Sequence, residues 1–238
     1  MPPRTASRSA RTAGGLAAAG LCVLLLSSCG GDSDGDGAPP EEVLEQAQQN
    51  LDDTSGLQIS LSTDDPLEGN AVLESAQGVA THAPAFEGSI TVKIVGQSAE
   101  VPIVAVDDQV YAEIPFTQGY QVVNPGDYGA PDPAQLMAPG TGFSSLLTAT
   151  TDVEEGESVR GGADNDEVLT EYTGTLDGDA VRGVMPSAQG EFDVSYTITE
   201  DNELRSADLT GVFFDDSDPM TYTLTFEDYG IEPDISAP

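Results

Sequence analysis

Basic residues are scarce in this chain. Seven lysine and arginine residues stand against 42 aspartate and glutamate residues, which gives a formal net charge of −35. Such a surface repels phosphate backbones and anionic headgroups, so it argues against nucleic-acid binding and against a polybasic grip on lipid. The excess acid is interpreted as an aid to solubility.

The side chains that most often perform catalysis or hold metals are scarce as well. His82 is the single histidine, so a Ser–His–acid triad would have to use it. The stretch from Gly142 to Leu146 places Ser144 without the second glycine of a nucleophile elbow. A zinc site would need further histidines or cysteines, and the chain has two cysteines in all. Counting alone does not settle whether two carboxylates pair for glycoside hydrolysis, because 42 acids make some close pair inevitable. The sequence therefore predicts neither an enzyme nor a bound metal or cofactor.

Long hydrophobic runs are also missing. The apolar stretch from Leu16 to Leu26 is short of the roughly 20 residues that a membrane-spanning helix needs. Three arginines precede it and two small residues follow it, which is the order of a signal peptide: Arg4, Arg8, Arg11, Ser27 and Ser28. Residues 1–28 are therefore predicted to be removed on export.

The end of this segment matches the lipobox of bacterial lipoproteins. Leu26-Ser27-Ser28-Cys29 has the aliphatic residue, the two small residues and the cysteine. Cys22 is a poorer acceptor because the larger Leu21 precedes it. The match implies diacylglycerol on the Cys29 thiol and cleavage before it. Two or three acyl chains hold a protein stably on a bilayer, so we expect a cell-membrane protein on the extracytoplasmic face.

Residues 29–40 are predicted to be an acidic, glycine-rich tether. Asp32, Asp34, Asp36 and Gly37 fit the first half of an EF-hand loop, but Val43 stands where the loop needs a bidentate glutamate. Charge repulsion and glycine favour a flexible spacer instead. The removed segment holds three of the seven basic residues, so the mature chain keeps four against 42 acids, a charge of −38. The mature chain has no second cysteine and is therefore predicted to form no intrachain disulfide. Residues 41–238 are predicted to fold as one domain around one core.

Hydrophobic periodicity predicts one helix followed mostly by strands. Val43, Leu44, Ala47 and Leu51 share a helical face from Pro40 to Ser55-Gly56. Period-two alternation then marks strands with one apolar and one polar face, and seven or eight antiparallel strands are expected; the clearest alternations lie at 57–62, 90–94, 192–199 and 221–226. Short helices are expected near Phe143–Leu147 and from Asp177, and an acidic hairpin near 153–168.

One large apolar sheet face with few helices leaves two arrangements open. The helices could pack the face solid, or they could leave an apolar gap between the layers. In the second case some inward residues face a ligand; the candidates are Ile90, Val92 and Ile94 on one strand and Phe143, Leu146 and Leu147 on the central helix.

Beyond the lipobox, the mature chain resembles the actinobacterial LppX/LprA/LprF/LprG lipoproteins over nearly its whole length. Five segments carry the resemblance besides the lipobox, and the last two named here are the most telling: NLDDTSGLQISLST, GVATHAPAFEGSITVKI, NPGDYGAPDPAQLMAPGTGFSSLL with the helix after it, TITEDNELRSADLTG and YTLTFEDYGIEPDISAP.

The resemblance implies an α+β fold, a curved antiparallel half-barrel with short helices across its concave face, similar to the LolA/LolB carriers. An apolar cavity between the layers would hold acyl chains of triacylated glycolipids, lipoglycans or triacylglycerol. The resemblance also implies that the protein works with an exporter of the major-facilitator class. Twelve residues are predicted to bind lipid: Ile59, Val79, Phe86, Ile90, Val92, Ile94, Val104, Val106, Phe143, Leu146, Leu147 and Val194. The alternative is a lipid-anchored structural or docking module with a packed core and no ligand. The strongly acidic surface departs from the family and speaks against a preference for anionic headgroups.

Overall fold

Eleven antiparallel strands form a single sheet in the part of the chain that the computed structural model describes, which is residues 37–65, 71–94, 97–128, 130–162, 165–214 and 217–238. The first six strands form a meander: β1 (Gly56–Ser62), β2 (Ala71–Thr81), β3 (Ala85–Ile94), β4 (Gln97–Val106), β5 (Gln109–Ala112) and β6 (Gln121–Val123). The last five form a second meander: β7 (Thr151–Gly161), β8 (Glu167–Asp177), β9 (Gln189–Thr199), β10 (Leu204–Val212) and β11 (Met220–Glu227).

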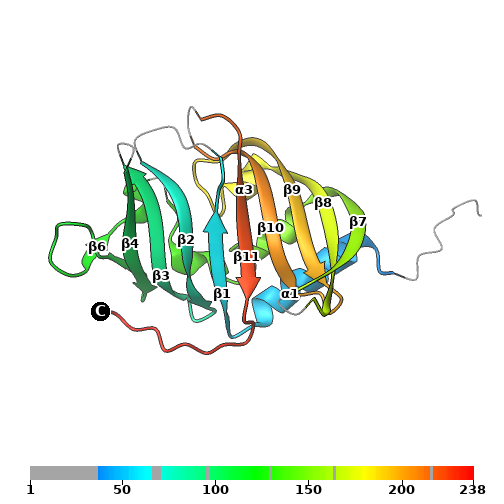
Figure 1. The fold of residues 1–238 in the computed structure, drawn as a ribbon, viewed down its shortest axis with the longest axis horizontal. Helices are drawn as coiled ribbons and strands as arrows, with labels where there is room; N and C mark the ends of the chain where they lie inside the picture. The colour runs from blue at the N-terminus through cyan, green and yellow to red at the C-terminus, as the bar shows by residue number, and fades with distance from the viewer. Residues whose placement is uncertain (1–36, 66–70, 95–96, 129, 163–164, 215–216) are drawn as a thin grey trace, which may run out of the picture. The chain divides into compact units, whose positions relative to one another are not determined.

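The two meanders join where β1 pairs with β11, and Ile59 lies opposite Phe226 there. This pairing leaves β6 and β7 as the two edges of the sheet (Figure 1). The helical segment between β6 and β7 therefore has to cross the sheet from one edge to the other.

The helices are few and short apart from the first. α1 (Pro40–Asp53) starts with a proline and two acidic residues, which suit the N-terminal turn of a helix. Its buried residues are those that the periodicity predicts: Val43, Leu44, Ala47 and Leu51. The other helical turns are η1 (Pro125–Tyr128), η2 (Pro133–Met137), α2 (Ser144–Ala149) and α3 (Gly178–Val181).

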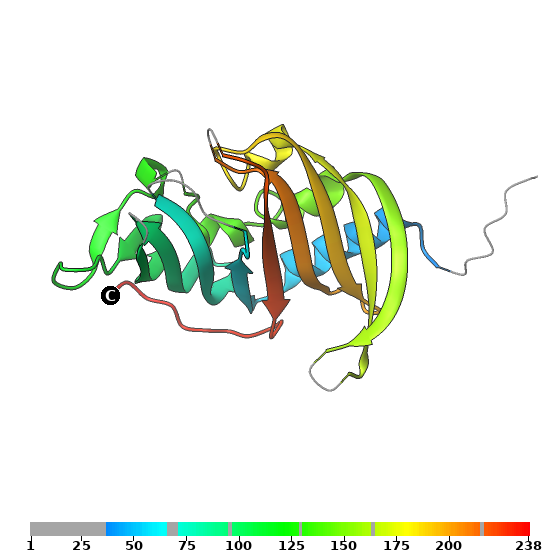
Figure 2. The ribbon, with the colours of Figure 1, turned by 45° about the horizontal axis from the view of Figure 1, so that its top comes forward.

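All of the packing helices lie against the same face of the sheet. α1 contacts α2 and β7, α3 contacts β8 and β9, and η2 contacts β2, β3 and β4. Figure 2 shows strands β7 to β10 passing around α1. Asn50 fixes the helix at this place, since its side-chain amide donates to the backbone carbonyls of Asp201 (3.0 Å) and Asn202 (2.8 Å) in the β9–β10 turn.

The sheet has more strands than the sequence predicts. The fold is mostly β, with eleven strands where seven or eight are expected. The missed strands lack a clean alternation. In β7 both faces carry polar residues, because it is an edge strand with little buried surface, so hydrophobic periodicity gives no signal there. Asp107 and Asp108 join β4 to β5, and both have the positive φ of a tight hairpin turn.

Candidate functional site

The two faces of the sheet differ sharply in chemistry. The inner face, which we define as the face that the helices cover, carries the apolar residues of the core, such as Phe192, Val194, Tyr196 and Ile198 of β9. The outer face carries hydroxyl and carboxylate groups that pair across strands. Ser60 and Thr225 lie 2.7 Å apart through their hydroxyl oxygens, and Thr210 and Thr221 lie 2.8 Å apart. An apolar ligand of the sheet would therefore lie on the inner face.

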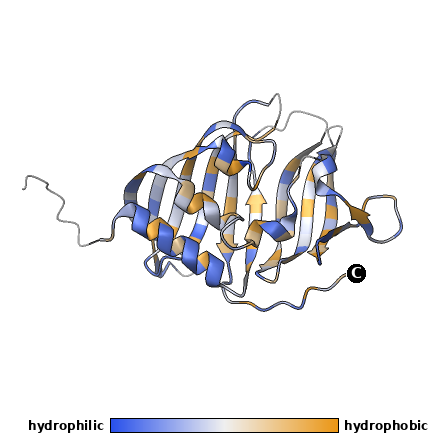
Figure 3. Ribbon diagram, turned by 180° about the vertical axis from the view of Figure 1, so that it is seen from behind, coloured by the Kyte–Doolittle hydropathy of each residue, from blue (hydrophilic) through white to orange (hydrophobic). Residues whose placement is uncertain are grey.

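The inner face is tightly packed on its β8–β11 half. Phe143, which precedes α2, stacks against Phe226 of β11 with ring centroids 5.1 Å apart. Leu146 and Leu147 of α2 are completely buried. The Thr150 hydroxyl lies 3.0 Å from the Tyr196 hydroxyl and thereby links the end of α2 to β9. Three of the predicted lipid-binding residues, those of the central helix, thus pack against protein in this structure. Figure 3 shows α1 in front of this half of the sheet.

The inner face of β1–β3 is only partly covered, although Val101 of β4, which lies opposite Ile90, is buried. At the start of β1 and β3 and the end of β2, the inward side chains Leu57, Phe86 and Ala80 are buried. Along the same strands the next inward side chains become half-buried: Leu61 of β1, Leu73 of β2, and Ile90 and Val92 of β3. Their registers place them side by side, because Leu61 lies opposite Ala76, Ala76 opposite Ile90, and Leu73 opposite Val92. We call Leu61, Leu73, Ile90 and Val92 the open end of the inner face.

Phe86 lies between the buried and the half-buried parts of this face. Gly78 and Gly88 face each other across β2 and β3. A Cβ added to either glycine would come within 2.8 Å of the tip of the Phe86 ring. The ring therefore lies directly on the two glycines, which leave room for it, and it forms one wall of the open end.

The structure separates the predicted lipid-binding residues into two groups. Ile59, Phe86, Ile90, Val92 and Val194 point to the inner face together with the three central-helix residues. Ile94 is the last residue of β3, and its backbone pairs with that of Ala71. Val79, Val104 and Val106 lie on the outer face instead, away from the apolar face, and their binding of lipid stays a prediction. The register decides this orientation, since Val79 pairs with Gln58, Val104 with Glu87, and Val106 with Gln109. Cys29 lies outside the described residues.

Leu61 and Leu73 belong to the open end but are absent from the predicted set. Leu61 shares the period-two pattern of Leu57 and Ile59, so the sequence carried a signal for it. Leu73 did not have one, because the register shifts between Leu73 and Ser75 and this β-bulge breaks the alternation of β2.

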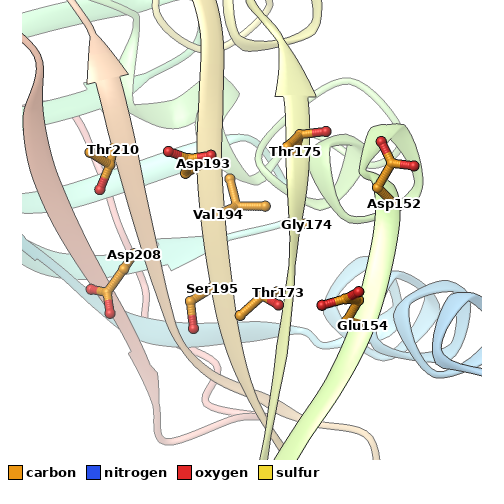
Figure 4. Close-up of a pocket in the computed structure, with 10 residues that line it drawn as sticks. All are labelled: Asp152, Glu154, Thr173, Gly174, Thr175, Asp193, Val194, Ser195, Asp208 and Thr210. Carbon is orange, nitrogen blue, oxygen red and sulfur yellow. The ribbon is translucent and has the colours of Figure 1, made fainter.

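Depressions on the outer face of the described residues are lined by polar side chains. The larger, of about 490 Å³, lies over β7 to β10 and is lined mainly by threonines and acids (Figure 4). The smaller, of about 260 Å³, is lined mainly by polar residues of β1 to β4. Within the described residues no three His, Cys, Asp or Glu side chains come together as metal ligands. The acids of the larger depression are thus a solvated polar surface.

Ionisable groups with shifted pKa values serve the packing of the sheet. Burial raises the pKa of Tyr196 and of Tyr222 far above the ordinary value. The hydrogen bond from Arg205 lowers the pKa of Glu167, and the two groups meet in two N–H···O contacts of 2.6 and 3.1 Å. Tyr222 is the one group among these that reaches the open end, where its hydroxyl donates to the backbone carbonyl of Leu73. Because burial keeps this phenol neutral, the open end is an apolar surface with no charged group of shifted pKa.

A scan of protein families matches residues 39–234 to the LppX_LprAFG lipoproteins. The chain belongs to this family. Membership implies a lipid anchor in a membrane, and it is consistent with an extracytoplasmic protein. The family is one of lipid-binding lipoproteins that are generally not enzymes. Among the described residues no helix is long and apolar enough to cross a membrane.

Solved structures of this family share the fold. LprF from Mycobacterium bovis superposes with a TM-score of 0.65 at 13% identity, over 85% of this chain and 99% of that one. LppX from Mycobacterium tuberculosis gives a TM-score of 0.60 at 13% identity, over 83% and 98%. A LolA superfamily protein from Nitrosomonas europaea reaches 0.28 at 11% identity, over 84% and 96%, a value too low to support a common fold. No curated protein matches the sequence.

Proposed function

We propose that this lipoprotein binds the acyl chains of an envelope lipid or glycolipid at the open end of its inner face. It would carry or display the lipid between layers of the cell envelope. One observation carries the proposal: apolar side chains of one continuous face are completely buried under α1 and α2 but only partly buried at Leu61, Leu73, Ile90 and Val92. Contiguous apolar surface that the protein does not fully cover is typical of ligand grooves and interfaces.

The chemistry of acyl-chain binding requires only a dry apolar surface. Removing apolar area from water contributes about 25 cal/mol per Å², or about 0.8 kcal/mol for each methylene. An acyl chain of about 16 carbons gains roughly 13 kcal/mol from its burial in a bilayer. The protein surface that takes up the chain has to supply a comparable free energy. The half-buried side chains of β1–β3 offer such a surface. The short helix η2 packs on β2–β4 and covers part of the same face.

The headgroup is predicted to remain outside this surface. The mature chain has four basic residues, and in the structure the guanidinium groups of Arg205 and Arg182 are paired with acids: Arg205 with Glu167 and Glu203, Arg182 with Asp179. The protein is therefore expected to select a neutral, sugar-rich headgroup over an anionic one. Delivery to or from an exporter of the major-facilitator class is a further part of this proposal.

The competing function is a lipid-anchored docking module with a filled core. The complete burial of Leu146 and Leu147 favours it, because the helical half of the inner face has no room for a ligand. Lipid analysis of the purified protein separates the two. Residues 30–238 keep the whole core, and mass spectrometry of their organic extract should detect acylated lipid in near-stoichiometric amount. A folded protein without bound lipid, even after incubation with envelope lipid extract, would support the docking module.

A further inference from the structure

The loop between β5 and β6 is unusual in this acidic chain. No charged residue occurs from Ile114 to Asn124, whereas 21% of all residues in the chain are charged. The same loop holds Phe116, whose side chain is fully exposed, and Tyr120, which is also exposed. Val122 follows on the edge strand β6 with 64% of its surface exposed.

The backbone of this loop displays Phe116 in a fixed position. The Ile114 carbonyl accepts hydrogen bonds from the Thr117 amide (3.1 Å) and from the Thr117 hydroxyl (2.8 Å), which closes a β-turn. Pro115 is the second residue of the turn, and Phe116 is the third with a φ of 70°. A turn of this kind requires positive φ at its third position, where glycine is normal. A bulky residue there is strained, and such strain is concentrated at functional sites.

The root of the loop is firmly held. Ile114 packs against the core, and the Glu113 amide donates to the Pro102 carbonyl at 3.0 Å. Val122 pairs with Tyr111 on the outer face. The loop and the strand that follows it therefore expose three apolar side chains, Phe116, Tyr120 and Val122, which we call the apolar tip.

The size and charge of this tip favour a lipid bilayer as its partner. A stable protein interface buries about 800 Å² on each side, far more than three side chains provide. An aromatic side chain can instead enter a bilayer interface singly, because its apolar ring and the polar surroundings of the turn suit that environment. The absence of acid from the tip allows it to approach headgroups that the rest of the surface repels.

The lipid anchor of the family would keep the bilayer within reach. The chain from Cys29 to Ala38 spans at most about 32 Å, so the folded unit stays close to the membrane at a high effective concentration. α1 packs against β7, and the tip lies on β6 at the opposite edge of the sheet (Figure 1). The two attachments would therefore act at different ends of the sheet.

We propose that the β5–β6 loop inserts Phe116, with Tyr120 and Val122, into the surface of the lipid bilayer to which the protein is anchored. This contact is separate from the binding of lipid cargo on the inner face. Since the body of the protein is acidic, docking should be stronger on phosphatidylcholine vesicles than on vesicles that also contain phosphatidylglycerol. Added salt should restore binding to the second kind by screening the repulsion.

Single tryptophans test the insertion directly, because the natural chain has none. In residues 30–238, Phe116→Trp is expected to give blue-shifted emission with phosphatidylcholine vesicles and to be quenched by brominated lipid. Val159→Trp on β7 is the matched control, since Val159 is 57% exposed at the other sheet edge. Its emission should not change. Equal responses of the two tryptophans, or no response of Phe116→Trp, would overturn the proposal.

A second variant separates docking from folding. Phe116→Gly suits the positive φ, so the melting temperature should stay the same or rise. Vesicle flotation of this variant should fall about tenfold, and Val159→Gly should float like the wild type if it is folded. Unchanged flotation of Phe116→Gly would contradict docking through this loop. The amount of co-purified lipid should be the same in Phe116→Gly and in the wild type, because cargo binds on the inner face. A wild-type protein that docks on vesicles but holds no lipid cargo would refute the proposed function and leave the docking proposal intact.

Discussion

Three tyrosine hydroxyls show how single residues link neighbouring segments of the fold. Tyr222 of β11 donates to the Leu73 carbonyl of β2 at 2.5 Å, across the end of β1. Tyr229 donates to the Leu204 carbonyl at 2.8 Å, and Tyr196 pairs with Thr150. Burial raises the pKa of each phenol far above its ordinary value. These groups therefore fold as neutral hydrogen-bonding partners.

The first prediction follows from these tyrosines at alkaline pH. A raised pKa in the folded state means that, above pH about 10, the unfolded chain loses protons that the folded chain keeps. The free energy of unfolding should thus be fully retained below pH about 10 and then fall by about 1.4 kcal/mol per pH unit for each tyrosine. Denaturant titrations across this range measure the slope. Tyr222→Phe should make it shallower by about one tyrosine's share, and a slope that is flat in the wild type contradicts the assignment.

The faces of individual residues could be predicted only where large and polar side chains alternate. Ile90 and Val92 alternate with threonine and lysine, so their inward orientation was readable. Val104 and Val106 lie in the run VPIVAV, which is apolar on both faces. Val79 is flanked by Gly78 and Ala80, and these small residues take the inward positions in β2. Strand pairing, which the sequence does not state, decides such cases.

At the scale of elements, the β2–β3 pair is shaped by the glycines beneath Phe86. A Cβ on Gly88 would lie 2.1 Å from the Gln77 carbonyl oxygen and 2.8 Å from the Phe86 ring. Two glycines facing each other weaken a sheet unless a neighbouring ring covers them. Phe86 provides that cover and at the same time bounds the open end.

The second prediction concerns this pair of strands. Gly88→Ala should lower the free energy of unfolding by about 1–3 kcal/mol, because both backbone and ring have to move. Gly126→Ala is the control, since its added Cβ meets only the Asn124 side chain at 3.4 Å. Chemical denaturation compares them. Equal stability of both variants would show that the ring does not occupy the glycine pair.

Elements with one polar and one apolar face were the predictable ones. α1, β9 and β11 appear where the periodicity places them. β7 was not predicted as a full strand, because Asp152, Glu154, Glu155 and Glu157 leave it no apolar face. Its charge protects an exposed sheet edge from pairing with other chains. The same charges remove the alternation of apolar and polar residues from which strands are recognised.

At the scale of the whole molecule, the lipid anchor remains a prediction for Cys29. Cys29→Ala removes the acceptor thiol, so acylation should be lost and the protein should leave the membrane fraction or stay unprocessed. Metabolic labelling with a radioactive fatty acid, followed by fractionation, measures this. Cys22→Ala should behave like the wild type. Labelling that persists in Cys29→Ala would contradict the lipobox interpretation.

The central claim is that the inner face is closed under α1 and α2 but open to acyl chains at β1–β3. Two tryptophan substitutions test the claim at these two places. Leu147 is completely buried, so Leu147→Trp should overpack the core and destabilise the protein by about 1–3 kcal/mol. Val92 is half-buried at the open end, so Val92→Trp should fold with little loss of stability and occupy the space of the ligand.

The decisive measurement is therefore the amount of lipid that co-purifies per folded molecule of Val92→Trp, determined by mass spectrometry beside a melting curve of the same preparation. We expect a melting temperature close to that of the wild type and the loss of most bound lipid. A destabilised Val92→Trp whose folded fraction still holds the wild-type amount of lipid would contradict an open inner face at β1–β3.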